Sequence, residues 1–203
     1  MPSPVALRVD AAYRARLRAL REAAVQRIAT EWGLLTLDQL EERFPGFVER
    51  AVKALAAAQV QGVTATRAYL RSMVRAETRQ VLDLAPPTGV AGSSEAGSLS
   101  DGFAPVRSMV YENLGRTKDP VAAMGLGLFL VSRMTDNEVT RAVDTEMIAQ
   151  ATAPDSPIRG WVGTVYGATD PCTGNVGFHT FDVPMYRHPG CKCDRTVAFG
   201  EIA

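Results

Sequence analysis

Cysteine and histidine are scarce in this sequence, which has three cysteines and two histidines among 203 residues. Because three is an odd number, a disulfide framework would leave one thiol over, and a reducing compartment is favoured over a secreted setting. The opening residues MPSPVALRVD contain no apolar signal core. The most apolar stretch, residues 121–134, is too short to span a bilayer and is interrupted by glycine. We therefore expect neither export nor a membrane partner.

Sequence motifs of the common enzyme classes are also missing. The sequence has no G-x-S-x-G, Walker A, G-x-G-x-x-G or H-E-x-x-H pattern. The run MGLGLF at 124–129 lacks a following Lys-Ser/Thr, so it indicates helix packing and not a phosphate loop. The acidic residues Asp136, Glu138, Asp144 and Glu146 are expected on the solvated side of a helix. No catalytic residue is predicted.

Charge is balanced over the whole chain but unevenly distributed. Residues 1–80 carry thirteen Lys/Arg and eight Asp/Glu, a net charge of +5, and the remainder carries −5. A basic helical surface suits an acidic protein partner or nucleic acid, although a simple solvated face is the commoner explanation. The candidate partner-facing residues of this surface are Arg14, Arg18 and Arg21.

The N-terminal part has the apolar periodicity of amphipathic helices joined by short loops. This pattern predicts a helical bundle, although the first helix would equally suit an arm laid along another subunit. The expected helices cover residues 11–32 with Asp10 as N-cap, residues 37–44 ending before Pro45-Gly46, and residues 47–81 with a break near Gly62.

The rest of the chain predicts a linker, further helices and a small β unit. Residues 85–106 are rich in Gly, Ser and Pro and predict an irregular linker. Helices are then expected over 107–115, 119–134 and 135–152, and short strands over 160–167, 176–183 and 195–202. The predicted fold class is α+β: a helical N-terminal domain or arm (1–84), a linker (85–106) and an α+β domain (107–203).

All three cysteines and both histidines of the chain lie within this β unit. Cys172, His188, Cys191 and Cys193 have the residue types of a Cys3His zinc site, with His179 as a fifth candidate. Asn175 stands where a second cysteine of a C-x2-C pair is expected. A disulfide and three free thiols therefore stay open as alternatives to zinc. A sheet this small needs such a cross-link, because it buries little apolar area.

The order of features from Val121 onward resembles a known family. A helix containing Glu138, Thr140 and Arg141 is followed by IRGWVGTVYGATDPC, with Trp161 and Cys172, and then by HPGCKC and a short strand. This pattern is similar to the C-terminal domain of Mu F-type minor head proteins of tailed bacteriophages, particularly those of actinobacterial phages. The resemblance covers about the last eighty residues, and Asn175 departs from it.

The resemblance implies a minor structural protein of the phage head. Such a protein would lie inside the capsid at the portal vertex after assembly in the host cytoplasm, and would act in head assembly or DNA ejection. Its implied partners are the portal protein and, in addition, packaged DNA, scaffold and major capsid protein. The alternative is a capsid maturation protease that acts on scaffold or capsid protein, for which Cys191 or Ser132 would be the first candidate nucleophiles.

Overall fold

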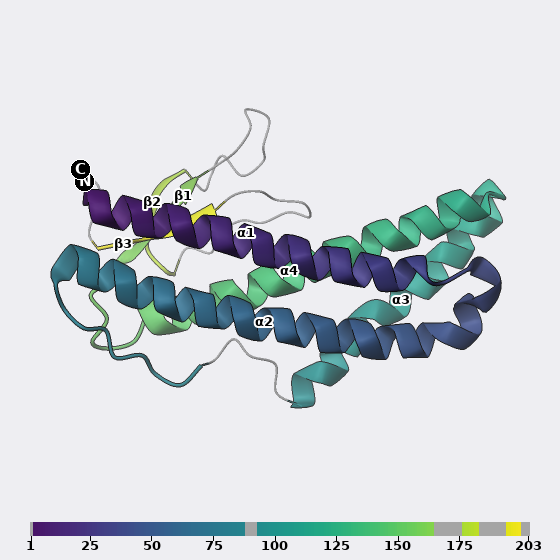
Figure 1. The fold of residues 1–203 in the computed structure, drawn as a ribbon, viewed down its shortest axis with the longest axis horizontal. Helices are drawn as coiled ribbons and strands as arrows, with labels where there is room; N and C mark the ends of the chain where they lie inside the picture. The colour runs from purple at the N-terminus through teal and green to yellow at the C-terminus, as the bar shows by residue number, and fades with distance from the viewer. Residues whose placement is uncertain (1, 88–92, 165–175, 183–193, 200–203) are drawn as a thin grey trace. The chain divides into compact units, whose positions relative to one another are not determined.

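The computed structural model describes residues 2–87, 93–164, 176–182 and 194–199, with side chains from residue 99 in α3, and these are mainly helical (Figure 1). The coarse prediction of an α+β chain, with helices first and a small sheet at the end, is confirmed. The elements are α1 (Pro4–Gly33), η1 (Leu37–Gln39), α2 (Leu40–Thr78), α3 (Ser93–Thr117), α4 (Pro120–Ala151), β1 (Gly160–Thr164), β2 (Gly177–His179) and β3 (Asp194–Ala198).

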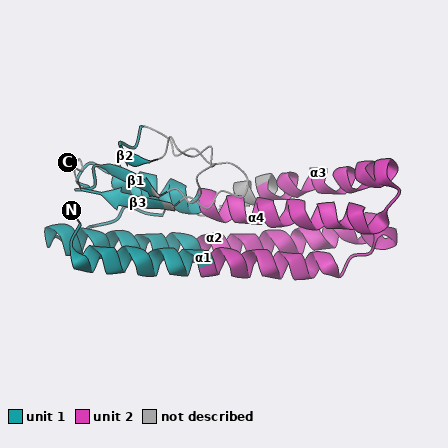
Figure 2. Cartoon of the chain, turned by 90° about the horizontal axis from the view of Figure 1, so that it is seen from above, with its two compact units in different colours: residues 1–18, 62–89, 142–203 teal, residues 19–61, 90–141 magenta. Residues whose placement is uncertain are grey.

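The chain divides into two compact units, each assembled from separate stretches of sequence (Figure 2). Unit 1 contains residues 1–18, 62–89 and 142–203, and unit 2 contains residues 19–61 and 90–141. Helices α1, α2 and α4 each belong to both units. The units therefore do not follow the predicted linear division at residues 84 and 107.

Helix α1 begins two turns earlier than its sequence pattern predicts. The Ser3 hydroxyl oxygen accepts a hydrogen bond from the Ala6 backbone N–H at 3.1 Å, and Pro4 occupies the first helical position. Asp10, predicted to be the N-cap, is instead buried within the helix. The prediction that Asp10 is the cap is wrong because Ser3 satisfies the free N–H groups first.

Helix α2 runs without interruption through Pro45 and Gly62, where the sequence predicts an end and a break. A proline inside a helix removes one backbone hydrogen bond. Phe44 and Phe47 are both buried beside this position, and their rings lie 5.9 Å apart. We attribute the continuity of the helix to this aromatic packing, which offsets the lost bond.

Residues 93–117 form helix α3, so the predicted irregular linker over 85–106 is wrong from Ser93 onward. The buried side chains of this helix are Leu99, Phe103, Val106 and Val110. Their spacing of four, three and four residues places them on one helical face. They join the core of unit 2, where Phe103 packs edge-on against Phe47 with centroids 6.0 Å apart.

Helix α4 replaces the two helices predicted over 119–134 and 135–152 with one continuous element. Its start is as predicted: the Asp119 carboxylate accepts hydrogen bonds from the backbone N–H groups of Val121 and Ala122, and Pro120 is the first helical residue. At the predicted junction Val131, Thr135 and Val139 are fully buried at four-residue spacing, so the packing of this helical face runs through it, and the Thr135 hydroxyl donates to the Val131 carbonyl at 2.7 Å.

The three described strands form one antiparallel sheet in the order β2-β1-β3. Trp161 of the central strand lies opposite His179 on one side and Val197 on the other. The Trp161 side chain is buried, and the His179 ring stacks on it with centroids 4.4 Å apart. The strands are shorter than predicted, in part because the predicted ends fall outside the described residues.

Candidate functional site

The three arginines predicted to face a partner differ in their surroundings. Arg18 is exposed on α1. Arg14 forms an ion pair with the Asp10 carboxylate at 2.5 Å. Arg21 donates two hydrogen bonds, at 2.6 and 2.7 Å, to the carboxylate of Asp136. Of the predicted set, only Arg18 thus presents an exposed guanidinium group, and Arg14 and Arg21 have structural roles.

A second basic row, which sequence reasoning missed, lies at the end of α2. Arg71, Arg75 and Arg79 are exposed at four-residue intervals, and none of them forms an ion pair with any described residue. Arg79 also has a φ of 60°, in the region that favours glycine. The four-residue spacing is visible in the sequence and would have indicated this row, which adds to the exposed basic surface of unit 1.

Asp10 is the centre of a buried polar network in unit 1. Its Oδ1 atom accepts hydrogen bonds from the Tyr69 hydroxyl at 3.2 Å and from the Thr196 hydroxyl at 3.0 Å. Tyr69 in turn accepts a hydrogen bond from the Val197 backbone N–H, at 3.3 Å. A side chain of α2 and a carboxylate of α1 therefore satisfy polar groups of β3 that the sheet itself leaves unpaired.

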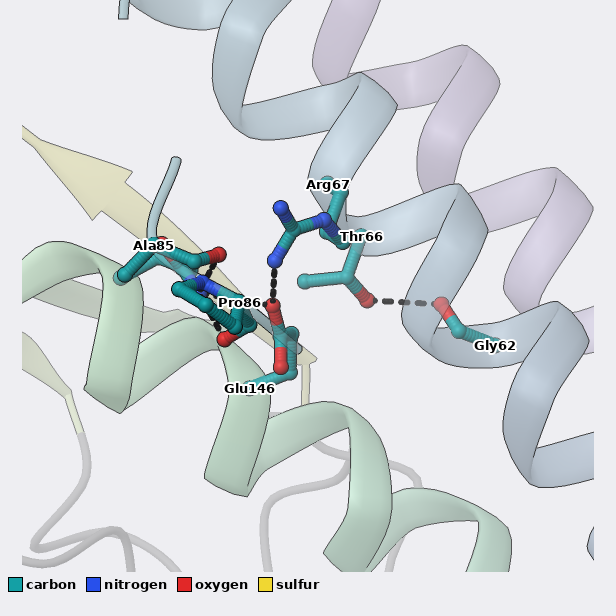
Figure 3. A network of polar contacts seen from close by, with 7 residues as sticks. Gly62, Thr66, Arg67, Ala85, Pro86 and Glu146 are labelled. Carbon is teal, nitrogen blue, oxygen red and sulfur yellow. Dashed lines mark hydrogen bonds and ion pairs between the residues drawn. The ribbon is translucent and has the colours of Figure 1, made fainter. Parts of the chain in front are cut away.

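A second buried network joins α2 to α4 within unit 1 (Figure 3). Glu146 is fully buried and pairs with Arg67 at 2.7 Å. Gln150 donates to Glu146 Oε1 at 3.0 Å and to the Ala85 carbonyl at 3.2 Å. The prediction that Glu146 lies on a solvated helix face is wrong, because this carboxylate has a charged partner from α2.

The surroundings of Tyr69 hold its hydroxyl in the protonated form. Burial raises the pKa of Tyr69 well above its usual value of 10.0, and the negative charge of Asp10 raises it further. The Tyr69 ring also stacks on Tyr13 with centroids 4.1 Å apart. A phenol in this position is a structural hydrogen-bond donor, and we assign it no acid–base role.

Replacing Tyr69 by phenylalanine is expected to change how stability depends on alkaline pH. In the wild type, the unfolded chain ionises Tyr69 above about pH 10 whereas the folded chain does not, so stability falls as pH rises from there. Tyr69→Phe removes this contribution to the slope and costs about 1–3 kcal/mol at neutral pH, because the Val197 N–H loses its acceptor. Urea titrations at several alkaline pH values measure both effects.

The matched control is Tyr111→Phe, since Tyr111 is exposed on α3. This variant should keep both the wild-type stability and the wild-type alkaline slope. An unchanged slope in Tyr69→Phe would contradict the assignment of a raised pKa to Tyr69.

The predicted metal-binding residues Cys172, His188, Cys191 and Cys193 lie outside the described residues. Among the residues that the structure does describe, no three His, Cys, Asp or Glu side chains are grouped as a metal site. His179, the fifth candidate, has its ring stacked against Trp161. The guanidinium of Arg195 lies over the same indole ring, 4.9 Å from its centroid, which adds a cation–π contact.

An apolar groove lies between α2 and α3 in unit 2. It has a volume of ≈ 630 Å³, and its lining includes Phe44, Val48, Val52 and Ala104. The charged residues at its edge are engaged with neighbours: Lys53 with Glu49, and Arg107 with Glu41. Three charged residues that line the groove, Glu49, Lys53 and Arg107, are therefore already bound to neighbouring side chains.

The protease alternative requires a nucleophile bonded to a base. Ser132, its candidate in the described part, lies on α4 next to Arg133 and Val131. In the described stretches of the chain no serine hydroxyl is hydrogen-bonded to a histidine. Cys191, the other candidate nucleophile, lies outside the described residues.

The comparisons with known proteins return no relative. No family model matches the chain, and neither a curated protein nor a solved structure matches it. Separately, none of the described helices has both the length and the apolar character required to cross a bilayer.

Proposed function

We propose that this protein is a minor structural component of a tailed-phage head that binds the portal protein and has no catalytic role. It would be assembled in the host cytoplasm and reside in the virion, inside the head at the portal vertex, with functions in head assembly or DNA ejection. Packaged DNA, scaffold and major capsid protein are further candidate partners.

One observation carries the proposal: the position of Trp161 in the sheet. The resemblance to Mu F-type minor head proteins depends on a strand led by tryptophan and on a strand after H-x2-C-x-C. In the structure Trp161 belongs to β1, and β1 pairs along its full length with β3, which begins immediately after Cys193. Trp161 and Val197, 36 residues apart in the sequence, are thus paired in one sheet, and this pairing is the support we have for the resemblance.

The exposed arginines of unit 1 supply a candidate contact surface. Arg16 and Arg18 on α1, and Arg71 and Arg75 on α2, are exposed and form no ion pair with described residues. Arg71 and Arg75 are like charges four residues apart, a spacing that destabilises a helix slightly. Their presence is explained if an acidic surface of the portal, or phosphate, lies against them.

Binding to the portal tests the proposal. Charge reversal at Arg16, Arg18, Arg71 and Arg75 to glutamate is expected to weaken binding to the purified portal at least tenfold, because four attractive contacts become repulsive. Truncation of residues 1–80 is unsuitable, since α1 and α2 contribute buried residues to both units. Surface plasmon resonance at two salt concentrations measures the effect.

A control variant reverses Arg43 and Arg116, which are exposed residues of unit 2. It should bind the portal as the wild type does. Equal binding by all three proteins would contradict a basic contact surface, and absence of any binding by the wild type would contradict the portal as partner. Weak portal binding combined with strongly salt-dependent DNA binding would identify DNA as the partner of these arginines.

We further propose that Cys172, His188, Cys191 and Cys193 hold the β unit together as a zinc clasp. Structural zinc contributes on the order of 10 kcal/mol to folding, and one disulfide about 2–4 kcal/mol. Protein purified without chelator should therefore contain close to one equivalent of zinc and lose β-unit stability when the zinc is removed. Low zinc with fewer than three free thiols would indicate a disulfide, and low zinc with three free thiols would contradict the clasp.

A further inference from the structure

The first three turns of α4 expose an unusual apolar face in unit 2. Val121, Leu128 and Phe129 have 81%, 39% and 52% of their surface exposed. Together with Gly125 they recur at helical spacings of four, three and one residues, which places them on one side of the helix. From Pro120 to Ser132 the helix carries no charged residue, in a chain that is 22% charged.

Gly125 forms a notch in this face. A Cβ atom added at Gly125 would meet no atom within 4 Å, so this glycine is not required by packing inside the chain. Glycine within a helix costs about 0.5–1 kcal/mol relative to alanine. An unfilled notch beside the exposed Phe129 ring therefore suits a helix that approaches from outside.

The face is complementary to itself. Phe129 follows Gly125 by one helical turn, so two copies of α4 packed antiparallel about a two-fold axis at the level of Gly127 place each Phe129 ring opposite the other copy's Gly125. We propose that this face of α4, formed by Val121, Gly125, Leu128 and Phe129, is the contact surface for a second copy of this chain. A two-fold interface uses the same patch on both copies, and this patch fulfils that condition.

Charges at the two ends of the face fit the same arrangement. Arg133 lies one turn after Phe129 and is 5.0 Å from its ring centroid, and Asp119 caps the start of the helix. Antiparallel packing brings Arg133 of each copy towards Asp119 of the other. The uncharged centre excludes a strongly charged partner, and the opposite charges at the ends fix the antiparallel direction.

The face extends over three turns, or about 16 Å. It is smaller than a standard interface of about 800 Å² per partner, so the association is weak and reversible. Sedimentation velocity of the full-length protein should show a shift from monomer to dimer across the micromolar range. The Phe129→Ala variant should weaken the dimer at least ~30-fold, because it removes the aromatic side chain at the interface centre.

Exchanging the side chains at positions 125 and 129 tests the packing of the ring into the notch. Gly125→Phe fills the notch and should abolish the wild-type dimer. The double variant Gly125→Phe/Phe129→Ala places the ring and the notch in exchanged positions and should dimerise again. An equimolar mixture of Gly125→Phe with Phe129→Ala should form heterodimers for the same reason, whereas each variant alone stays monomeric.

Val81→Ala, which changes an exposed valine outside α4, serves as the control and should dimerise as the wild type does. Circular dichroism and thermal melting confirm that each variant is folded. A monomeric wild type throughout the micromolar range would overturn the proposal, and so would a dimer unaffected by Gly125→Phe. Failure of both the double variant and the mixture to associate would overturn the antiparallel arrangement.

Discussion

Replacing Gly127 by alanine is expected to lower the free energy of unfolding by about 3 kcal/mol, near the upper end for overpacked cores. A Cβ atom at Gly127 would lie 2.0 Å from Cζ2 of Trp32 and 2.6 Å from Cη2. The indole cannot move aside easily, because its Nε1 donates a hydrogen bond to the Met124 carbonyl and its ring packs edge-on against Phe47. Urea denaturation followed by tryptophan fluorescence measures the loss.

The matched control lies two residues away on the same helix. Gly125→Ala meets no atom within 4 Å and should raise stability by about 0.5–1 kcal/mol, as expected when an exposed helical glycine is replaced. Both variants should be compared at a concentration at which the wild type is monomeric. A destabilised Gly127→Ala beside a stabilised Gly125→Ala would be diagnostic of packing, whereas a stabilised Gly127→Ala would contradict the position of Trp32.

Glu146→Gln is expected to destabilise the protein by about 3–5 kcal/mol, because it leaves the Arg67 guanidinium largely buried without a counter-charge. The side chain of Arg67 is 15% exposed, and Glu146 is fully buried. Gln150 and the Ala85 carbonyl depend on the same carboxylate for their arrangement. Chemical denaturation of Glu146→Gln, Arg67→Met and the double variant gives the coupling energy.

The double variant should be less destabilised than the sum of the single variants, since it removes both buried charges together. The surface pair of Glu49 and Lys53 provides the control, because these side chains are 68% and 72% exposed. Glu49→Gln should change stability by less than about 0.5 kcal/mol. A comparably small effect of Glu146→Gln would contradict the burial of the ion pair.

Local sequence was sufficient to predict that most of these helices exist, but it did not always predict the residues at which they begin and end. The cap at Asp119 and the proline after it act within one turn, and the start of α4 was predicted from them. At α1 the same chemistry is present in Ser3-Pro4, but Asp10 offered a competing cap. The continuity of α2 through Pro45 depends on aromatic neighbours that no local rule contains.

The linker prediction was wrong because it relied on the composition of the segment and not on its apolar periodicity. The segment 85–106 is rich in Gly, Ser and Pro, and its polar composition led to the prediction of irregular structure. Leu99, Phe103 and Val106 already recur at helical spacing in the same segment, and the structure buries all three. An apolar spacing of four and three residues thus outweighed a composition that is typical of loops.

The roles of charged residues depended on partners distant in sequence. Arg21 and Asp136 are 115 residues apart, and Arg67 and Glu146 are 79 residues apart. Each of these residues fits an exposed helical position when its own helix is considered alone. Only the three-dimensional arrangement distinguishes them from Arg18, which the prediction placed at the surface and which is exposed.

Quantitative mass spectrometry of phage particles from the strain that carries this gene tests the proposed function most directly. If the chain is a minor head protein, its peptides will be present in purified heads at a small fraction of the copy number of the major capsid protein, and heads lacking the gene will assemble or eject DNA poorly. Absence of the protein from purified heads, together with normal assembly and infectivity when the gene is deleted, would contradict the account.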